Sequence, residues 1–360
     1  MNDPRAPLHL DQLRQSVAPP PAHVAEAAAK RVAGLATPPG ALGRLGELAV
    51  WIAATQGQVP PRQLVNVRLV VFAGDHGVAN YGVSAFPATI TAATVRAALA
   101  GRLGVNALSL AHGICVRVLD MGVDSDFADL PKGTRNALQK YKIRRSSGVL
   151  HLEDALTRRE TETALAAGAL VAREEVEQGA QLVISGDLGI GNTTAAAALI
   201  AAGLGLRARD VVGRGTGIDD AGLERKVGIV DAALTRLAER ASDPIETLAA
   251  LGSADLAAAT GYLLTAARLR VPALLDGLMA VACAYTADRI APGASQWFAA
   301  GHRSTEPAQS LALSSLGLVP ILDLGLSLGE GSGAVAAVPI LRSAAAILND
   351  VAKMNDVLPE

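Results

Sequence analysis

Residues 181–202 read QLVISGDLGIGNTTAAAALIAA. A short apolar run over residues 181–185 leads into a turn with closely spaced glycines, and a helical segment follows from residue 192. An apolar run of this length is typical of a strand that is buried on both faces of a sheet. A strand, a glycine-containing turn and a helix in that order form the βα unit of a parallel sheet. This stretch therefore predicts an α/β fold.

The same order of elements recurs along the chain. Further apolar runs are expected to be strands, at residues 67–73, 114–120, 271–275 and 318–322. Helical spacing is found at residues 219–241 and 254–269. We therefore expect a mainly parallel Rossmann-like sheet flanked by helices.

The two ends of the chain have a different character. Residues 1–20 are polar and contain proline, which predicts an extended arm, and helical spacing is found at residues 22–35, 43–55 and 333–353. We expect these terminal regions to form a small helical domain. The predicted division is an N-terminal arm with helices at 1–60, an α/β catalytic domain at 61–335 and a returning C-terminal helix at 336–360.

Composition excludes several classes of protein. Half of the residues are hydrophobic, so the chain can bury enough surface to offset its ordering entropy, which excludes disorder. The 32 basic and 34 acidic residues give a net charge of −2, and only 3% of the residues are aromatic. This composition lacks the basic face and the stacking side chains of a nucleic-acid binder, so nucleic acid is not an expected partner.

The lack of a targeting signal and the placement of the two cysteines indicate a reducing compartment. No run reaches the roughly 18 apolar residues of a membrane span, and no signal-peptide pattern follows the N-terminus. Cys115 and Cys283 lie far apart within apolar runs, where we expect buried thiols rather than a disulfide. The prediction is a cytoplasmic protein without a membrane span.

Two glycine-rich turns are candidate anion sites. Residues 186–194 read GDLGIGNTT, and residues 213–217 read GRGTG after the pair Val211-Val212, which we expect to belong to a strand. Closely spaced glycines let backbone N–H groups approach a phosphate. A helix that begins at Asn192 or Thr193 would add its N-terminal dipole.

Side chains of the second turn favour the same interpretation. Arg214 offers a guanidinium and Thr216 a hydroxyl as further donors to a phosphate. Taken singly, each turn is also explained as a tight turn in which Asn or Thr caps a helix. The glycine order is the reverse of a dinucleotide fingerprint, and no lysine follows as in a P-loop, so a monophosphate is favoured over NAD or a triphosphate.

Glu330 lies between glycines in the stretch LGEGSG at residues 328–333. Burial beside Leu326 and Leu328 would raise the pKa of its carboxyl group and suit it to act as a general base. The alternative is a solvated turn residue or an acidic residue in the first turn of a helix.

Other residues have both a structural and a functional interpretation. Asp75 and His76 are expected to orient their loop, with Asp75 accepting backbone N–H bonds, because adjacent residues in a turn rarely face one metal ion. Lys226, taken alone, is a surface lysine. Tyr81 and Phe86 either mark a site for a flat apolar ligand or anchor their loop to the core.

Together these motifs resemble the nicotinate-nucleotide–dimethylbenzimidazole phosphoribosyltransferases of cobalamin lower-ligand synthesis. The resemblance covers nearly the whole chain, at residues 38–45, 72–78, 82–87, 186–194, 213–217, 275–277, 302–307 and 322–333. The stretches GDLGIGNTT and LGEGSG are its most specific parts.

The resemblance implies an activity and a mechanism. Members of the family displace nicotinate from nicotinate mononucleotide with 5,6-dimethylbenzimidazole, giving α-ribazole 5′-phosphate with inversion at the anomeric carbon. Glu330 matches the general base that takes the benzimidazole N–H proton. No metal or redox cofactor is expected, the partners are small-molecule substrates, and the family suggests a homodimer. A nucleotide hydrolase and a non-catalytic mononucleotide-binding protein stay open as alternatives.

The resemblance also implies two groups of binding residues. The residues expected at the nucleotide phosphate and ribose are Asp187, Gly189, Ile190, Gly191, Asn192, Thr193, Arg214, Gly215, Thr216, Lys226 and Ser304. Those expected at the benzimidazole are Ser84, Phe86, Leu188 and Leu328. Ala93 and Thr94 stand where the family often carries larger side chains near the base, so the sequence leaves open which base is accepted.

Overall fold

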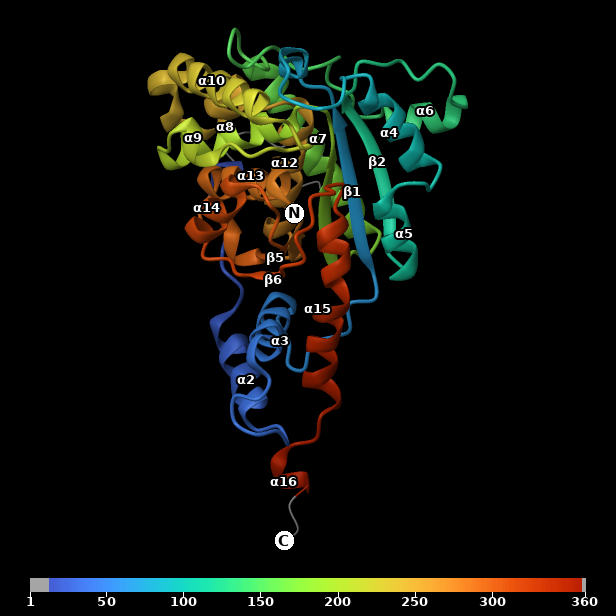
Figure 1. Ribbon diagram of the computed structural model, residues 1–360. Coiled ribbons are helices and arrows are strands. Elements are labelled where there is room, and N and C mark those ends of the chain that lie inside the picture. Colours follow the sequence, from blue (N-terminus) through green and yellow to red (C-terminus); the bar gives the residue numbers. More distant parts are fainter. Residues whose placement is uncertain (1–12, 358–360) are drawn as a thin grey trace.

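The computed structural model describes residues 13–357, so residues 1–12 of the arm predicted at residues 1–20 lie outside the described residues. Figure 1 shows a parallel sheet with helices on both faces. The six strands have the order β2-β1-β3-β4-β5-β6, and every neighbouring pair is parallel. Their bounds are β1 (Val67–Gly74), β2 (Cys115–Gly122), β3 (Leu182–Leu188), β4 (Ala273–Leu275), β5 (Phe298–His302) and β6 (Pro320–Leu322). The predicted α/β class with a parallel sheet is confirmed.

Each face of the sheet is covered by its own apolar core. Successive side chains of a strand point to opposite faces, so Val70 and Phe72 of β1 join one core while Leu69 and Val71 join the other. The first core is covered by α7 (Arg158–Glu177), α8 (Asn192–Leu204), α9 (Ala208–Val211), α10 (Asp220–Leu237), α11 (Pro244–Leu251), α12 (Ala254–Arg268), α13 (Leu278–Ile290) and α14 (Pro307–Leu316). The second is covered by α2 (Ala22–Ala33), α3 (Gly43–Gln56), α4 (Ile90–Leu99), α5 (Gly104–Ala111), α6 (Lys132–Leu138) and α15 (Ser332–Asp350).

Two helices of the first layer cross with their backbones in contact. A Cβ at Gly168 of α7 would lie 1.8 Å from the carbonyl oxygen of Ala258 on α12. A Cβ at Gly261 of α12 would lie 2.1 Å from that of Leu165 on α7. Only glycine therefore permits this close packing at either position.

The strand order determines where a ligand can bind. In chain order β2 lies on one side of β1 and β3 on the other, so the winding direction of the sheet reverses between β1 and β3. In open parallel sheets ligands bind beyond the carboxyl ends of the strands, near such a reversal. Since all strands are parallel, the loops after β1, β3, β4, β5 and β6 leave from this one edge.

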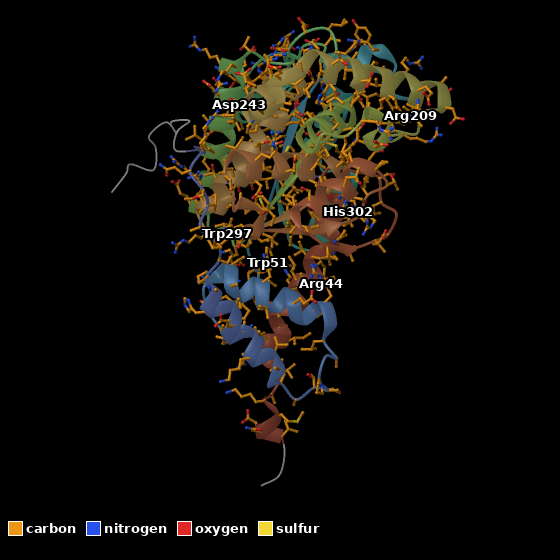
Figure 2. The ribbon with its side chains drawn as sticks, turned by 90° about the vertical axis from the view of Figure 1, so that its left-hand side faces the viewer. Arg44, Trp51, Arg209, Asp243, Trp297 and His302 are labelled. Atoms are coloured by element: carbon orange, nitrogen blue, oxygen red, sulfur yellow. The ribbon has the colours of Figure 1, made fainter. Side chains whose placement is uncertain are left out.

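The helices α2 and α3 and the C-terminal half of α15 project from the lower end of the sheet in Figure 1. Ala28 of α2, Ile52 of α3 and Leu348 of α15 are buried in one core that continues into the sheet. At the junction, shown in Figure 2, the indole N–H of Trp51 donates to the carbonyl oxygen of Gln296 at 3.2 Å. The domain division at residues 60 and 335 stays a prediction.

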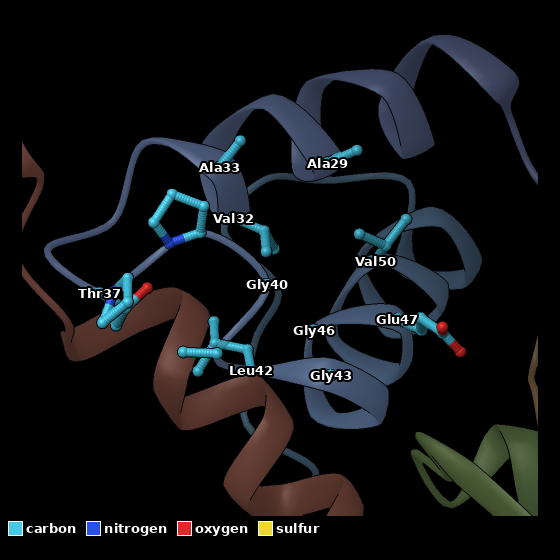
Figure 3. Close-up of a pocket in the computed structure, with 13 residues that line it drawn as sticks. Ala29, Val32, Ala33, Thr37, Gly40, Leu42, Gly43, Gly46, Glu47 and Val50 are labelled. Atoms are coloured by element: carbon cyan, nitrogen blue, oxygen red, sulfur yellow. The ribbon is translucent and has the colours of Figure 1, made fainter.

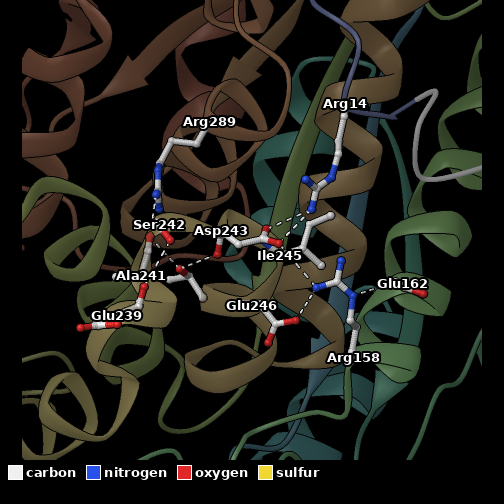
Figure 4. A network of polar contacts seen from close by, with 11 residues as sticks. Arg14, Arg158, Glu162, Glu239, Ala241, Ser242, Asp243, Ile245, Glu246 and Arg289 are labelled. Carbon is white, nitrogen blue, oxygen red and sulfur yellow. Dashed lines mark hydrogen bonds and ion pairs between the residues drawn. The ribbon is translucent and has the colours of Figure 1, made fainter.

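The first described residues pack against the α/β part of the chain. Leu13 and Val17 are buried in the first core, and the Val17 N–H donates to the Pro292 carbonyl oxygen at 3.0 Å. Figure 4 shows the guanidinium of Arg14 on the carboxylate of Asp243, at 2.9 Å. From residue 13 onward, the expectation of an unpacked arm is therefore wrong, because two apolar side chains four residues apart are enough to anchor the segment.

Two strand predictions are corrected. The strand Phe298–His302 (β5) was not predicted, because its alanines and glycine give no β-branched run. Val211 ends the short helix α9 and Val212 follows it, so the predicted strand there is wrong. Two valines are too few for a strand, and the segment Arg207–Asp210, joined by an ion pair at 2.9 Å, turns as a helix instead.

Two further expectations concern burial. Cys283 is buried as expected, whereas Cys115 at the start of β2 is exposed. Among the described residues, α15 is the one helix long and apolar enough, by length and composition, to cross a membrane. It is also a core helix, with 56% of that stretch buried inside the protein, so this is weak evidence for a span.

Candidate active site

A cavity of about 260 Å³ opens at the carboxyl edge of the sheet, between the loops that follow β1, β3, β4, β5 and β6. Most of the predicted site residues line it: Phe86, Asp187, Leu188, Gly189, Ile190, Asn192, Thr193, Gly215, Thr216, Ser304, Leu328 and Glu330. The others, Ser84, Gly191, Arg214 and Lys226, lie outside its lining. Segments far apart in the sequence thus meet at one site.

The loop after β3 leads directly into the N-terminus of α8. Gly191 precedes the helix with φ +95°, a left-handed conformation that favours glycine. The side-chain amide of Asn192 donates to Asp187 Oδ1 at 2.5 Å, and its oxygen accepts the Thr193 N–H at 2.8 Å. The Ile190 N–H is fixed by the hydroxyl of Thr91 at 3.1 Å. These bonds hold the loop in a fixed arrangement, and Asn192 and Thr193 place the N-terminal end of α8, with its dipole, at the cavity.

A buried acidic cluster lies behind this loop. Burial, together with the negative charge of Asp255, raises the pKa of Asp187 well above its usual value. Asp255 in turn lies 3.3 Å from His76 Nε2, and that histidine keeps the pKa of Asp255 below its usual value against the effect of burial. Asp75 Oδ2 accepts the Asp124 N–H at 2.8 Å, which confirms its expected role in orienting the loop.

The second glycine-rich loop is tied to two other loops of the cavity. The Gly215 N–H donates to Glu306 Oε1 at 2.8 Å. The Thr216 hydroxyl lies 3.0 Å from that of Ser84 and accepts the Ala85 N–H at 2.8 Å. Ser84 therefore contributes to the site through Thr216, from behind the cavity wall.

Lys226 and Arg214 differ from their expected placement. Lys226 is fully buried rather than a surface lysine, and its ammonium donates to Thr193 Oγ1 at 2.9 Å and to the Gly213 carbonyl oxygen at 3.1 Å. Arg214 turns away from the cavity, because its guanidinium donates to the Ile218 carbonyl oxygen and pairs with Asp220. Lys226 therefore bonds to both glycine-rich loops.

Glu330 adopts an unusual backbone conformation. Its φ of +66° is left-handed, which is uncommon for a residue with a side chain. Gly329 and Gly331 flank it with φ of +76° and +97°. Gly186 of β3 makes room for the turn, since a Cβ there would lie 2.2 Å from the Glu330 carbonyl oxygen.

Asp276, at the end of β4, holds this turn in place. Its Oδ2 accepts the Gly331 N–H at 3.0 Å, and its Oδ1 accepts those of Gly333 and Ala334 at 2.8 and 3.0 Å. His302 Nε2 lies 3.4 Å from Asp276 Oδ1. Burial lowers the pKa of His302, but the neighbouring carboxylate outweighs it and the net shift is upward. Asp276 is a buried acceptor for the first N–H groups of α15.

The carboxyl group of Glu330 is nearly buried, since the residue is only 9% exposed. Its Oε2 accepts the Val105 N–H at the N-terminus of α5, at 3.0 Å. Burial raises the pKa of Glu330, the Val105 N–H opposes this, and the charge of Asp276 raises the pKa further. A carboxylate with a raised pKa at a ligand cavity is suited to accept a proton near neutral pH.

The wall next to Glu330 is apolar. Phe86, Ile90, Met279 and Leu328 line this part, and Phe86 and Leu328 are each 52% exposed. The hydroxyl of Thr94 also lines it but already donates to carbonyl oxygens within its own helix. This end of the cavity therefore suits a flat, largely apolar ring. Tyr81 does not reach it and packs edge-on against another ring, that of His151.

Residue-by-residue reasoning missed three contributors. Glu306 bonds to Gly215, Asp276 orders the Glu330 turn, and the Val105 N–H binds the Glu330 carboxylate. The available signal for Asp276 is its position directly after the predicted strand at 271–275, whereas Glu306 follows β5, which the sequence does not predict. Within residues 13–357, no group of three or more His, Cys, Asp or Glu side chains is arranged to hold a metal ion.

A second cavity, of about 420 Å³, lies between α2, α3 and the loop at residues 37–43, as Figure 3 shows. Although it is larger, its lining is mostly aliphatic, with Thr37 and Glu47 the polar side chains. Glu47 is paired with Arg44 on the surface. This cavity lacks the convergent polar groups of a catalytic site, so we place the site at the sheet edge.

Comparisons with known proteins agree with this placement. A family model described as phosphoribosyltransferase matches residues 17–357. The chain is 52% identical to the nicotinate-nucleotide–dimethylbenzimidazole phosphoribosyltransferase of Mycolicibacterium paratuberculosis (strain ATCC BAA-968 / K-10), over 94% of this chain and 95% of that protein. It is 50% identical to the protein of the same name from Mycobacterium tuberculosis (strain ATCC 25618 / H37Rv), over 93% and 92%.

Solved structures give the same result. The crystal structure of CobT from Thermus thermophilus superimposes with a TM-score of 0.88 at 44% identity, covering 92% of this chain and 98% of that one. At this identity and coverage, the two proteins resemble each other in sequence as well as in fold, over nearly the whole chain. The chain described here belongs to the phosphoribosyltransferase family that these relatives represent.

Proposed function

We propose that the protein transfers the phosphoribosyl group of nicotinate mononucleotide to 5,6-dimethylbenzimidazole, giving α-ribazole 5′-phosphate and nicotinate. The relatives that are 52% and 50% identical to this chain are named for this activity. The observation that carries the proposal is that Glu330 lines the same cavity as both glycine-rich loops. The proposed proton acceptor and the proposed phosphate-binding loops therefore line the same cavity.

The nucleotide binds along the polar side of the cavity in this proposal. Its phosphate meets the N-terminus of α8 at Asn192 and Thr193 and the loop at Gly215 and Thr216, with Lys226 supplying positive charge from behind Thr193. Helix N-termini and backbone N–H groups favour an anion at such a point. The remaining predicted contacts to the phosphate and ribose are Asp187, Gly189, Ile190, Gly191 and Ser304, whereas Arg214 turns away from the cavity.

The acceptor base binds at the apolar end. Phe86, Leu188 and Leu328 enclose the flat ring beside Glu330, and Ser84 supports this wall through Thr216. As one ring nitrogen bonds to the anomeric carbon, the proton on the other nitrogen passes to Glu330. The bond to nicotinate breaks, and its electron pair stays on the pyridine nitrogen.

The leaving group determines what the protein must supply. The nicotinate ring is a cationic pyridinium in the substrate and leaves as a neutral pyridine, so it needs no protonation. Catalysis then consists of holding two reactants in position and removing one proton. We propose no metal or redox cofactor for this step.

Three finer statements belong to the same proposal. We propose a homodimer in the cytoplasm, without nucleic acid as a partner. Sedimentation of the purified protein tests the first statement, because a dimer has twice the mass of the chain. A sedimenting species with the mass of one chain would contradict it.

The activity is tested by incubating the purified protein with nicotinate mononucleotide and several candidate bases. We expect free nicotinate and one ribazole phosphate per nicotinate when dimethylbenzimidazole is present, measured by chromatography. Release of nicotinate without any base would identify a hydrolase instead. Binding of the mononucleotide with no product from any base, over a range of pH, would contradict the proposal.

A further inference from the structure

Glu306 is a buried carboxylate at the start of α14. It is the residue before the first turn of that helix, yet its side chain makes no bond to the helix N–H groups. The residue is 8% exposed and lines the cavity at the end where Thr193 and Thr216 also lie. Short polar side chains are the usual helix caps at this position, and the longer side chain of Glu306 bonds to another loop instead.

That loop is Gly213–Gly217. Glu306 Oε1 accepts the Gly215 N–H at 2.8 Å. The carboxylate also packs against the backbone of Gly213, where a Cβ would lie 2.4 Å from Oε2. A side chain at Gly213 would therefore displace the carboxylate from its present position. The Oε2 atom is buried and has no hydrogen-bond partner among the residues that the structure describes.

Lys226 holds the same loop from the other side. Its ammonium donates to the Gly213 carbonyl oxygen at 3.1 Å and to Thr193 Oγ1 at 2.9 Å. Burial lowers the pKa of Lys226, and the negative charge of Glu306 opposes that shift. The loop is thus held by a cation from α10 and an anion from the start of α14, and Lys226 joins it to the N-terminus of α8.

We propose that Glu306 is a positioning residue for the mononucleotide phosphate: by fixing the Gly215 N–H it holds the Gly213–Gly217 loop against α8. The inference rests on the proposed function of this loop. Gly215 has φ +52°, so nothing in its own conformational preference fixes it there, and the carboxylate supplies the constraint. Without the acceptor, the loop would have to be ordered each time that substrate binds.

This role affects binding of one substrate. Glu306 bonds to the loop that is proposed to receive the phosphate, and not to the residues proposed at the base. Losing an interaction that contributes equally to the ground state and the transition state raises KM and leaves kcat unchanged. Removal of a hydrogen bond to a charged group costs about tenfold in affinity.

The test compares two substitutions at Glu306. Glu306→Ala is expected to raise the KM for nicotinate mononucleotide about tenfold, with kcat and the KM for dimethylbenzimidazole within about threefold of the unchanged protein. Glu306→Gln keeps an oxygen that can accept the Gly215 N–H. We expect it to restore the KM to within about threefold.

A matched control separates positioning from loss of a buried carboxylate. Glu175 is also buried but lies at the opposite end of the sheet, where Arg68 and Arg117 pair with it. Glu175→Ala should lower the thermal midpoint without changing the KM for the mononucleotide. Folding of every variant is checked by its thermal midpoint.

The outcomes distinguish this inference from the proposed function. If the unchanged protein forms no ribazole phosphate, the proposed function fails before Glu306 is tested. If it is active and Glu306→Ala leaves KM unchanged, the positioning role is overturned. A lower KM in Glu306→Ala would also overturn it, since the carboxylate would then compete with the phosphate for the Gly215 N–H. Equal increases in KM for Glu306→Ala and Glu306→Gln would exclude the role as acceptor.

Discussion

The two ends of the parallel sheet treat buried carboxylates differently. At the amino ends of β1 and β2, both oxygens of Glu175 are paired, one with Arg68 at 2.6 Å and one with Arg117 at 2.9 Å. At the carboxyl edge, Asp187 and Glu306 each keep one buried oxygen that has no hydrogen-bond partner among residues 13–357. Both ends belong to one fold, but among residues 13–357 the buried carboxylate oxygens that lack a hydrogen-bond partner lie at the carboxyl edge.

This difference separates stability from function. A buried carboxylate with both oxygens paired supports the folded state, whereas an unpartnered buried oxygen costs free energy. Such groups are uncommon in folded proteins and concentrate where a ligand or a reaction uses them. Substitutions at the carboxyl edge should therefore change activity, whereas substitutions at the amino end should change stability.

The largest expected effect is at Glu330. Glu330→Gln keeps the size of the side chain but cannot accept a proton, so kcat should fall by about a thousandfold, within the range for loss of a general base. Mononucleotide binding, measured by calorimetry, should stay within about threefold because the phosphate loops are untouched. Near-normal turnover in this variant would refute the role of Glu330 as general base.

A substitution at the amino end of the sheet should change stability and leave activity unchanged. Glu175→Ala leaves Arg68 and Arg117 partly buried without their shared partner, which should destabilise the protein by about 3 kcal/mol. Denaturant unfolding measures this loss. The kcat of the folded fraction should be unchanged, and a clear drop in kcat would show that the two ends are coupled.

Much of the fold could be predicted from the sequence because its central strands are continuous apolar runs. The strands β1 and β3 are buried almost throughout, so their sequences contain little besides apolar residues and glycine. β5 has the sequence FAAGH, in which small residues carry no strand preference. β5 is a strand because it pairs with β4 and β6, and this pairing cannot be recognised from the local sequence.

Some residues of the candidate site could likewise be predicted from the sequence, and others could not. Glu330 was a candidate from sequence because a charged residue between glycines is locally unusual. The contact of Glu306 with Gly215 joins residues 91 positions apart and exists only because the fold brings their loops together. Arg214 was predicted at the phosphate from its place between glycines, but Asp220 and the Ile218 carbonyl oxygen nearby take its guanidinium.

A third prediction concerns how closely the Glu330 turn approaches the sheet. Gly186→Ala would place a Cβ 2.2 Å from the Glu330 carbonyl oxygen, so the turn must move. A shift of about 1 Å in a reacting group should lower kcat about 10- to 100-fold. Steady-state kinetics measures this loss.

The matched control for that substitution is Gly168→Ala, in which a Cβ would lie 1.8 Å from the Ala258 carbonyl oxygen in the contact between α7 and α12. It should destabilise the protein and leave the kcat of the folded fraction unchanged. If both alanine variants lose kcat equally, the effect of Gly186→Ala is general loosening of the fold and not displacement of Glu330.

The smallest expected effect is a difference in how stability depends on pH at the two ends. Burial raises the pKa of Glu330, so between its ordinary value of 4.5 and its raised value the folded protein binds more protons than the unfolded chain. Stability is then lost as pH rises through this window. Burial also opposes ionisation of Glu174, at the amino end, but bonds from Lys140, Tyr141 and Arg117 outweigh it and lower its pKa. The stability that ionised Glu174 contributes is present above pH 4.5 and is lost as the pH falls.

Glutamine substitutions should expose these opposite signs. At about pH 4 the thermal midpoint of Glu330→Gln should be close to that of the unchanged protein, and at about pH 8 it should be higher by a few degrees, because the variant has no carboxylate to ionise in a buried site. Glu174→Gln should instead lie below the unchanged protein at about pH 8, with the gap closing toward acid. Thermal unfolding followed by circular dichroism across this range measures both differences. Parallel curves for all three proteins would mean that neither carboxylate is linked to folding, and the contrast between the two ends would then rest on activity alone.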